Sequence, residues 1–391
     1  MAQIAPRPAP QRPRSLYLHV PFCFHKCHYC DFYSIVDRQD RQPAFTARLI
    51  EELDALAPFA GPLETIFVGG GTPTLLAPDL WKTLLGALHT RFELSEDTEF
   101  TVEANPETVT PEIADVLAAG GVNRVSIGAQ SFNPRHLATL ERWHNPDNVE
   151  RAIELVRAAG IARQSLDLIF AIPGQSVEDW TEDLDRALGL GATHLSAYNL
   201  TYEPATAMTA RLHKGEFEPI DEELEVDMLD ALIEHTEAQG LGRYEVSNFA
   251  DNGDECAHNL AYWRQDDWLA AGPSASGHFD GFRWKNTPRL ADYLAGSDRG
   301  FPTATDVEAP DPRRALCERV MTGLRLCEGL DLADLLRRAE PLGAAARLNA
   351  AVGRLQTEGL TRPDVDRLRL NREGLLRADG LAADVMNAID P

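Results

Sequence analysis

The sequence predicts an α/β fold in which a parallel sheet curls towards a barrel and is followed by a smaller helical domain. Six short apolar runs alternate with amphipathic helical patterns, and these patterns often open with Pro or Asp and close with Gly. The apolar runs suit strands that are buried on both faces, as in parallel sheets with right-handed crossovers. With 391 residues, of which 44% are hydrophobic, the chain has material for one large core and a second, smaller one.

The predicted elements follow one another as six strand-helix units, which is the pattern of a partial (β/α)6 barrel. The strands are predicted at Ser15–Val20, Thr65–Val68, Glu99–Glu103, Arg124–Gly128, Ser165–Phe170 and His194–Asn199. The helices between them are predicted at Pro43–Leu56, Pro78–Leu88, Pro111–Ala119, Asp147–Ala159 and Val177–Leu188. Ligand sites are expected where the carboxyl ends of the strands meet.

Composition divides the chain into four parts. Residues 1–14 are proline-rich and basic without an apolar segment, which predicts a short disordered tail and no signal peptide. The barrel is predicted at 15–290, a connector rich in Gly and Pro at 291–312, and a C-terminal domain at 313–391. In that domain, helical patterns at Arg313–Leu326, Leu330–Arg338 and Gly343–Glu358 precede alternating stretches at Leu360–Asp364, Arg367–Asn371 and Gly374–Ala378, which predict a β-ribbon.

The charge balance excludes several classes of partner. A formal net charge of -24 argues against general affinity for nucleic acid or anionic membranes, since both require a basic face. No run of about 18 apolar residues is present, so no membrane span is expected. The protein is expected in the cytosol, where thiolates remain reduced.

Cys23, Cys27 and Cys30 form a C-x3-C-x2-C loop directly after the first predicted strand. Three thiolates at this spacing can hold three irons of a [4Fe-4S] cluster and leave the fourth iron open. A zinc site completed by His25 or His28 is an alternative, but no second cysteine pair follows. Three cysteines in one loop cannot all pair, so a disulfide framework is the weakest of the three interpretations.

Polar and glycine residues follow several other predicted strands. A glycine run, Gly69–Gly71, comes after the second strand; it allows close backbone approach to a ligand or simply a tight turn. Glu103, Gln130 and Asp167 lie at or near the ends of the third, fourth and fifth strands. Because a polar group in an apolar strand costs free energy unless it is paired, several at successive ends indicate one common ligand.

These motifs together resemble the radical S-adenosylmethionine (SAM) enzymes, in particular the group that contains oxygen-independent coproporphyrinogen III oxidase (HemN) and the heme chaperone HemW. The resemblance extends from about Tyr17 to Gly277. It joins YLHVPFC-x3-C-x2-C, GGGTPT, VEANP, SIGAQSF, LERWHNP, LDLIFAIPGQ and CAHNLAYW in order. It implies a radical SAM barrel carrying a [4Fe-4S] cluster, with a small C-terminal domain that is helical and winged-helix-like.

The resemblance also implies roles for individual residues. Cys23, Cys27 and Cys30 would hold the cluster, and SAM would chelate its open iron. The methionyl part of SAM would meet Gly70, Gly71 and Thr72, and the rest of it would be framed by Tyr17, Glu103, Gln130, Arg142 and Asp167.

Three features place the chain nearer to HemW than to the oxidases. The fourth cysteine of the oxidase pattern is replaced by Phe32, only 14 residues precede the first strand, and residues 256–263 match the HNxxYW signature. The resemblance thus implies a heme-binding chaperone that delivers heme to acceptor proteins. The alternative is an oxygen-independent coproporphyrinogen III dehydrogenase. A radical enzyme that acts on an unrelated substrate is a third alternative. A homodimer and membrane-associated acceptor proteins are also compatible with the sequence.

Within the HNxxYW segment, His258 is the predicted axial heme ligand, and Cys256 is an alternate one. Tyr262 and Trp263 are expected to line the macrocycle with aromatic surface. The competing interpretation pairs His258 with Asn259 in a buried hydrogen bond that closes the barrel. The C-terminal domain shows no basic stripe, so a lid or docking surface is expected there, not a nucleic-acid site.

Overall fold

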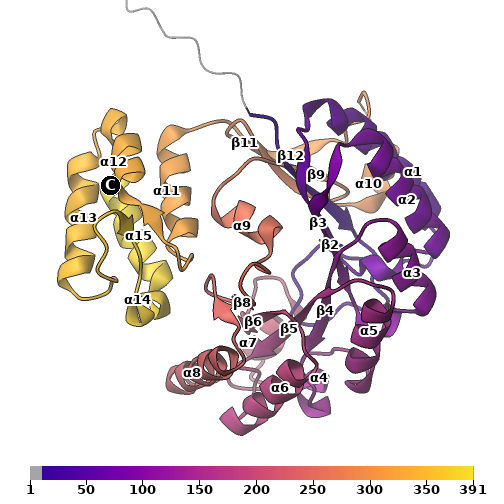
Figure 1. Ribbon diagram of the computed structural model, residues 1–391, viewed down its shortest axis with the longest axis horizontal. Coiled ribbons are helices and arrows are strands. Elements are labelled where there is room, and N and C mark those ends of the chain that lie inside the picture. The colour runs from indigo at the N-terminus through magenta and orange to yellow at the C-terminus, as the bar shows by residue number, and fades with distance from the viewer. Residues whose placement is uncertain (1–10, 297, 391) are drawn as a thin grey trace, which may run out of the picture.

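The computed structural model describes residues 11–296 and 298–390. Within them, twelve strands form one mixed sheet in the order β12-β11-β10-β9-β1-β2-β3-β4-β5-β6-β8-β7. Its middle is a curled parallel sheet in chain order (Figure 1). The parallel strands are β1 (Ser15–Val20), β2 (Leu63–Gly70), β3 (Leu94–Ala104), β4 (Arg124–Gln130), β5 (Arg163–Phe170) and β6 (His194–Asn199). The predicted α/β class is confirmed.

Helices cover the outer face of this parallel sheet (Figure 1). Those predicted from the sequence are α1 (Gln42–Leu56), α2 (Pro78–Arg91), α3 (Pro111–Ala119), α5 (Asp147–Ala158) and α6 (Val177–Gly189). Those not predicted are α4 (Pro134–Thr139), α7 (Ala207–His213) and α8 (Glu222–Ala238). Trp81 of α2 and Trp180 of α6 are fully buried between helices and sheet, where large apolar side chains stabilise the fold most.

The sheet continues beyond both ends of its parallel part, which the sequence analysis did not predict. β8 (Asn248–Ala250) pairs with β6 in an antiparallel manner, and β7 (Gly242–Arg243) pairs with β8, again antiparallel. Next to β1 lies the parallel strand β9 (Trp268–Ala271), and antiparallel strands follow it outward: β10 (Ser276–Phe279), β11 (Phe282–Asn286) and β12 (Ala304–Glu308). The stretch predicted as a connector thus contains α10 (Leu290–Ala295) and the edge strand β12.

The C-terminal helices have their own apolar core, with Leu316, Leu348 and Val385 among its buried members. The helices are α11 (Pro312–Gly323), α12 (Leu332–Ala339), α13 (Ala345–Thr357), α14 (Arg372–Leu376) and α15 (Ala378–Ile389), with a short pair β13 (Leu330–Asp331) and β14 (Arg367–Leu368). The predicted ribbon is reduced to this pair and a Thr361–Leu370 bridge. The prediction of a strand at residues 374–378 was wrong, because α14 begins one residue after Asn371, whose side chain caps it.

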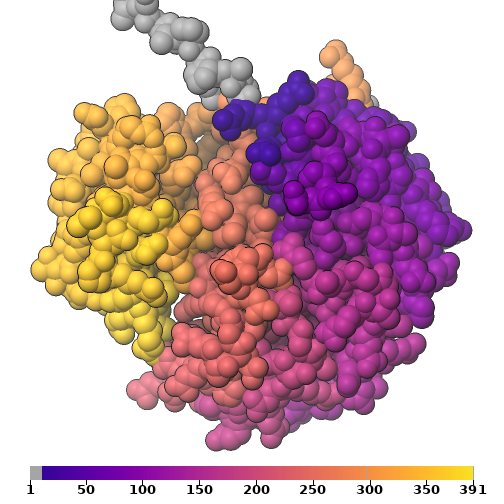
Figure 2. Space-filling view, viewed as in Figure 1, coloured from indigo at the N-terminus to yellow at the C-terminus, as the bar shows by residue number. Residues whose placement is uncertain are grey.

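The helix α9 (Ala257–Trp263) lies between the barrel and the C-terminal helices (Figure 1). It contacts α11 on one side and β2 on the other. Figure 2 shows the C-terminal helices as a distinct body beside the barrel, with residues from the region of α9 filling the space between.

Residues 1–10 of the predicted disordered tail lie outside the described residues. Residues 11–14 are described, and they run alongside the start of β2. The Pro13 carbonyl accepts the Gly61 amide at 2.9 Å, and the Arg14 carbonyl accepts the Glu64 amide at 2.7 Å. Within the described residues, hydrogen bonds to the sheet therefore begin before β1.

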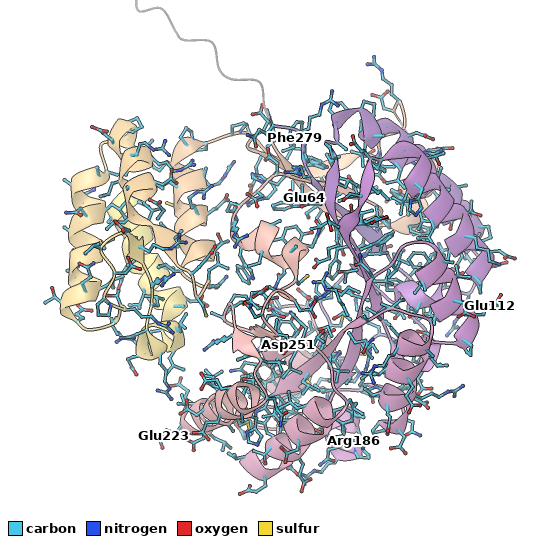
Figure 3. The ribbon with its side chains drawn as sticks, in the orientation of Figure 1. Glu64, Glu112, Arg186, Glu223, Asp251 and Phe279 are labelled. Atoms are coloured by element: carbon cyan, nitrogen blue, oxygen red, sulfur yellow. The ribbon has the colours of Figure 1, made fainter. Side chains whose placement is uncertain are left out.

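Charged side chains point outward from the helices that surround the sheet, as Glu112, Arg186 and Glu223 do in Figure 3. Arg186 pairs with Asp147 across neighbouring helices at 2.7 Å. In the part of the chain that the structure describes, no helix is long and apolar enough to cross a membrane.

The end of β2 approaches the end of β1 so closely that a side chain would not fit between them. The Gly71 amide donates to the Val20 carbonyl at 2.8 Å, and a Cβ on Gly71 would lie 2.7 Å from the Phe22 carbonyl oxygen. Residues 20–22 lead directly into the cysteine loop. The glycine at position 71 therefore fixes where that loop leaves the sheet.

We expect Gly71→Ala to destabilise the fold by about 1–3 kcal/mol, because the neighbouring atoms are backbone and the strand ends must separate. Urea unfolding of the metal-free protein measures the change. Gly86→Ala is the matched control: Gly86 is exposed in α2 with nothing within 4 Å of an added Cβ, and we expect a gain of about 0.5–1 kcal/mol. Equal stability of the two variants would contradict the steric argument.

Candidate functional site

The three cysteines lie on a loop that the backbone closes at its base. The Ile35 amide donates to the Pro21 carbonyl, and the Cys23 amide donates to the Ile35 carbonyl, both at 2.8 Å. Cys27 is buried, while Cys23 and Cys30 are half-buried. All six cysteines of the chain lie within the described residues, and none forms a disulfide. Among residues 11–296 and 298–390, no three His, Cys, Asp or Glu side chains converge as ligands of a single metal ion.

The glycine segment after β2 supports this loop. The Thr72 amide donates to the Phe22 carbonyl at 2.7 Å, and the Thr72 hydroxyl lies 3.6 Å from the Cys23 sulfur. The Gly70 amide donates to Glu103 at 3.0 Å. Since the amides of Gly70, Gly71 and Thr72 are all used, this backbone can offer a ligand only carbonyl oxygens. Carbonyls suit a ligand that carries an amino group.

A buried arginine lies beside the cysteines. Arg142 donates to the Gly128 carbonyl at 2.9 Å and lies 3.7 Å from the Cys27 sulfur. Its Nε is buried without a protein partner. Gln130 has a left-handed backbone, with φ of 65°, at a bulge in β4. A Cβ on Gly128 would meet both the Gln130 amide and the Arg142 guanidinium, so these two side chains converge above that glycine.

This arrangement fits a [4Fe-4S] cluster held by three thiolates. The thiols are unpaired and share one loop, and the buried guanidinium supplies positive charge next to Cys27. A thiolate-ligated cluster is anionic, so an adjacent buried cation stabilises it.

A cavity of about 550 Å³ lies inside the barrel. Its walls come from β1 to β6, from the residues that follow Cys30, from α9, and from β9 to β11. The predicted site residues that line it are Tyr17, Gly70, Glu103, Asp167 and His258. Phe32, whose side chain is 61% exposed, lines its edge. Gly71, Thr72, Gln130 and Arg142 lie outside this lining, beside the cysteine loop.

Two carboxyl groups face the cavity from β3 and β5. Burial, together with the charge of Asp167, raises the pKa of Glu103 to about 7. Burial also raises the pKa of Asp167, against the hydrogen bonds from Ser196 and Ser126, the latter at 2.9 Å. Both groups are therefore poised to pair with a cationic or hydroxyl-bearing ligand, which would replace their lost hydration.

His19 and Tyr17 stabilise the path of the chain after the cysteines. Tyr17 shares a hydrogen bond with His19 Nδ1 at 3.1 Å, and His19 Nε2 meets the Tyr33 carbonyl at 2.8 Å. Burial lowers the pKa of His19 to about 4, against the hydrogen bond to Tyr33. A neutral His19 with both nitrogens partnered is a structural group of the cavity wall.

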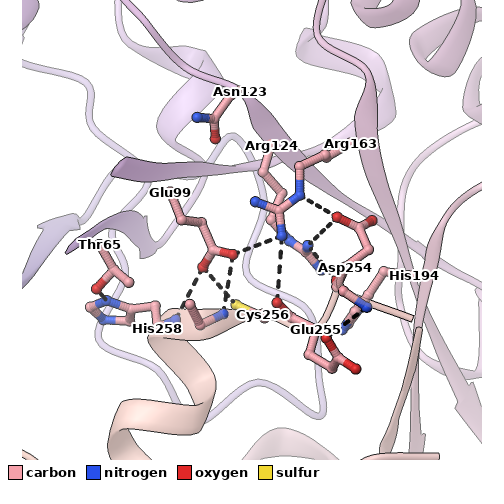
Figure 4. Close-up of polar contacts among 12 residues, drawn as sticks. Thr65, Glu99, Asn123, Arg124, Arg163, His194, Asp254, Glu255, Cys256 and His258 are labelled. Carbon is pink, nitrogen blue, oxygen red and sulfur yellow. Dashed lines mark hydrogen bonds and ion pairs between the residues drawn. The ribbon is translucent and has the colours of Figure 1, made fainter. Parts of the chain in front are cut away.

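The HNxxYW segment is attached to the floor of the barrel by Glu99 of β3 (Figure 4). Its carboxylate accepts the His258 amide at 3.0 Å and the Ala257 amide at 3.1 Å, and it lies 3.5 Å from the Cys256 sulfur. Arg163 of β5 pairs with the same carboxylate at 3.0 Å and with Asp254. These contacts satisfy the first amides of α9, which a short helix leaves unpaired.

Sequence reasoning did not single out Glu99 or Arg163. The argument applied to Glu103 could have found Glu99, since it too is a carboxylate in an apolar strand. Nothing in the sequence pairs it with a helix almost 160 residues later.

The His258 ring forms two hydrogen bonds, and neither is to Asn259. Nδ1 meets the Thr65 hydroxyl at 2.8 Å, and Nε2 meets the Tyr262 hydroxyl at 2.9 Å. Burial lowers the pKa of His258 to about 3, so its imidazole is neutral. The competing interpretation, in which His258 pairs with Asn259, is therefore wrong, since the ring bonds to Thr65 and Tyr262 instead.

Cys256 as an alternate ligand stays a prediction: it lines the cavity beside His258, and burial raises its pKa to about 12. The expectation for the two aromatic residues requires correction. Tyr262 lines the cavity, but Trp263 points to the C-terminal helices, where the Arg325 guanidinium lies 5.7 Å from its ring centroid. The two aromatic residues, adjacent on a helix, therefore cannot both line one macrocycle.

A curled parallel sheet with a three-cysteine loop after its first strand defines a radical SAM protein. Comparison with protein-family models agrees: the radical SAM superfamily matches residues 17–187, and the HemN C-terminal domain matches residues 311–377.

Known relatives narrow the assignment. Heme chaperone HemW of Mycobacterium tuberculosis (strain ATCC 25618 / H37Rv) is 37% identical over 388 residues, which cover 97% of this chain and 96% of that protein. Heme chaperone HemW of Escherichia coli (strain K12) is 37% identical over 309 residues, 76% of this chain and 80% of that protein. The chain belongs to the HemW family.

Among solved structures, coproporphyrinogen III oxidase (HemN) from Escherichia coli superposes with a TM-score of 0.82 at 23% identity. The match covers 98% of this chain and 91% of that one. At this identity the likeness shows a shared fold and no more.

We expect Glu99→Ala to lower the free energy of unfolding by about 2–4 kcal/mol, because it leaves the buried His258 amide, the partly buried Ala257 amide and part of Arg163 without a partner. Urea unfolding followed by circular dichroism measures the loss. Glu96→Ala, an exposed glutamate on the same strand, should change it by about 0.5 kcal/mol or less. A loss at Glu99 no larger than at Glu96 would show that the carboxylate does not secure α9.

Proposed function

We propose that this protein is a heme-binding chaperone of the HemW type that delivers heme to acceptor proteins. The observation that carries the proposal is the cavity wall formed by α9. There the HNxxYW segment presents a neutral imidazole, His258, and a tyrosine, Tyr262, to a space of about 550 Å³. The relatives named heme chaperone HemW support the same interpretation. The cytosolic location expected from the reduced thiols goes with this proposal.

We further propose that Cys23, Cys27 and Cys30 hold a [4Fe-4S] cluster beside Arg142. When bound, such a cluster supplies an open iron for SAM and a source of one electron. Two groups of residues would bind SAM. The carbonyls of residues 70–72 would accept its amino group, while the remaining contacts would come from Tyr17, Glu103, Gln130 and Asp167.

For heme, the geometry favours His258 as an exchangeable ligand. The bond between Nδ1 and Thr65 orients the ring, as outer hydrogen bonds orient ligating histidines in metal sites. Nε2 is hydrogen-bonded to the Tyr262 hydroxyl, and this bond would have to break before Nε2 could bind the heme iron. The low pKa supports this role, because only a neutral imidazole can ligate.

The alternative function is an oxygen-independent coproporphyrinogen III dehydrogenase. The fold shared with the HemN structure is compatible with this activity. Phe32, which stands at the position of the fourth oxidase cysteine, argues against it. The two functions differ in whether a porphyrin changes covalently.

The first test incubates anaerobically reconstituted protein with SAM, a reductant and coproporphyrinogen III, and separately titrates it with hemin. We expect no decarboxylated porphyrin by mass spectrometry, and stoichiometric hemin uptake followed by transfer to an apo-hemoprotein. Multiple turnovers to protoporphyrinogen would contradict the chaperone proposal and establish the dehydrogenase. Iron and sulfide analysis confirms that the cluster is intact in both arms.

We expect His258→Ala to weaken hemin binding at least tenfold and to shift the Soret band, because the proposed axial ligand is lost. Tyr262→Phe, which removes only the competing hydroxyl, should keep the wild-type Soret band and bind hemin as tightly or more tightly. Visible absorption titration measures both. An unchanged spectrum and affinity in His258→Ala would leave this histidine a structural role alone.

A further inference from the structure

Lysine is scarce in this chain and one lysine is placed unusually. The four lysines are Lys26, Lys82, Lys214 and Lys285, against 33 arginines. The first three are exposed, whereas Lys285 is half-buried in β11 and lines the barrel cavity. A strongly hydrated ammonium group is rarely placed in a cavity wall without a partner.

The structure gives Lys285 no such partner. Within the described residues no ion pair joins its ammonium to a carboxylate, although the chain holds 61 acidic residues. Exposed Lys82, by contrast, pairs with Asp79 at 2.9 Å. Burial lowers the pKa of His19, and the hydrogen bond to the Tyr33 carbonyl raises it in part. The positive charge of Lys285 lowers this pKa further. The ammonium therefore acts on the cavity side of the sheet.

Two serines line the same wall of the cavity as Lys285. Ser276 of β10 is directly opposite Lys285 in the antiparallel pair, so the two side chains share a face. Ser274, in the turn before β10, also lines the cavity and has a left-handed backbone with φ of 66°. A residue other than glycine held in this conformation is a frequent mark of a functional site.

The other walls reinforce the contrast in charge. Glu103 and Asp167 face the cavity from β3 and β5, so an anionic group would be repelled there. Arg124 is the other strong cation of the lining; its Nη1 donates to the Asp254 carbonyl at 2.9 Å and lies 3.6 Å from the Asp254 carboxylate, while its Nη2 is buried without a partner. Arg124 nevertheless has a carboxylate partner in Asp254, whereas the cation of the β10-β11 wall has none within the described residues and shares its wall with two serines.

We propose that Lys285, assisted by Ser274 and Ser276, binds a carboxylate of the cavity ligand. This inference rests on the proposed function, and for heme the group bound is a propionate. Lys285 would then fix which edge of the macrocycle points towards β10 and β11, while the opposite wall remains with Glu103 and Asp167. No covalent step is involved.

The test compares hemin with hemin dimethyl ester, which has the same macrocycle and iron but no carboxylate. Titrations use the full-length protein and the variants Lys285→Ala and Lys285→Arg, with Lys82→Ala as the matched control. We expect Lys285→Ala to weaken hemin binding about tenfold and to leave ester binding unchanged, because a charge-assisted bond to the propionate is lost. Lys285→Arg should recover most of the hemin affinity, and Lys82→Ala should match the wild type.

The outcomes distinguish a failure of the carboxylate site from a failure of heme binding itself. Wild-type protein that binds hemin and its ester equally, or Lys285→Ala that binds hemin normally, would overturn the carboxylate site and leave heme binding intact. Equal weakening of hemin and ester in Lys285→Ala would also overturn it, by assigning the loss to the fold. Wild-type protein that binds neither compound would overturn both proposals.

Discussion

The anchoring of α9 by the Glu99 carboxylate is the interaction on which the rest of the site depends. This one buried carboxylate accepts hydrogen bonds from the first two amides of the helix and forms an ion pair with Arg163. Because a buried carboxylate is costly unless its oxygens are filled, this attachment has few alternative arrangements. It determines where the His258 ring enters the cavity and which side of α9 faces the C-terminal helices.

Two regions of the barrel are built on different principles. Around the cysteines, contacts are between backbone groups: residues 20–22, 71 and 72 are held by amide-carbonyl bonds, and the Arg142 guanidinium lies beside Cys27. The cavity next to it is lined instead by side chains from nearly every strand. A rigid backbone cradle suits a group that stays in place, whereas a wall of side chains can adapt to one that enters and leaves.

The sequence predicted the parallel core well and the additions to it poorly. The bounds of β1 and β6 agree with the prediction because both runs are short, apolar and flanked by turns. The first half of β3 was missed since residues 95–97 are exposed and polar, and they lie at an irregularity between the paired positions Leu94 and Glu99. The strands β9 to β12 are short and mostly half-polar. The pairing of β9 with β1, to which the other three strands are added in turn, is set by tertiary contacts that local pattern does not show. Local pattern could not reveal that Lys285 faces the same cavity as Glu103, or that Trp263 turns away from it.

The opposite directions of Tyr262 and Trp263 make α9 a shared boundary. A ligand that takes Nε2 of His258 must displace the Tyr262 hydroxyl, and the next residue along is the ring against which Arg325 rests. Arg264 follows, paired with Glu328 at 2.9 Å. Three consecutive side chains thus span from the interior of one domain to the surface of the other. Because this single helical turn contacts both β2 and α11, a displacement on its cavity side would also change its contacts with the C-terminal helices.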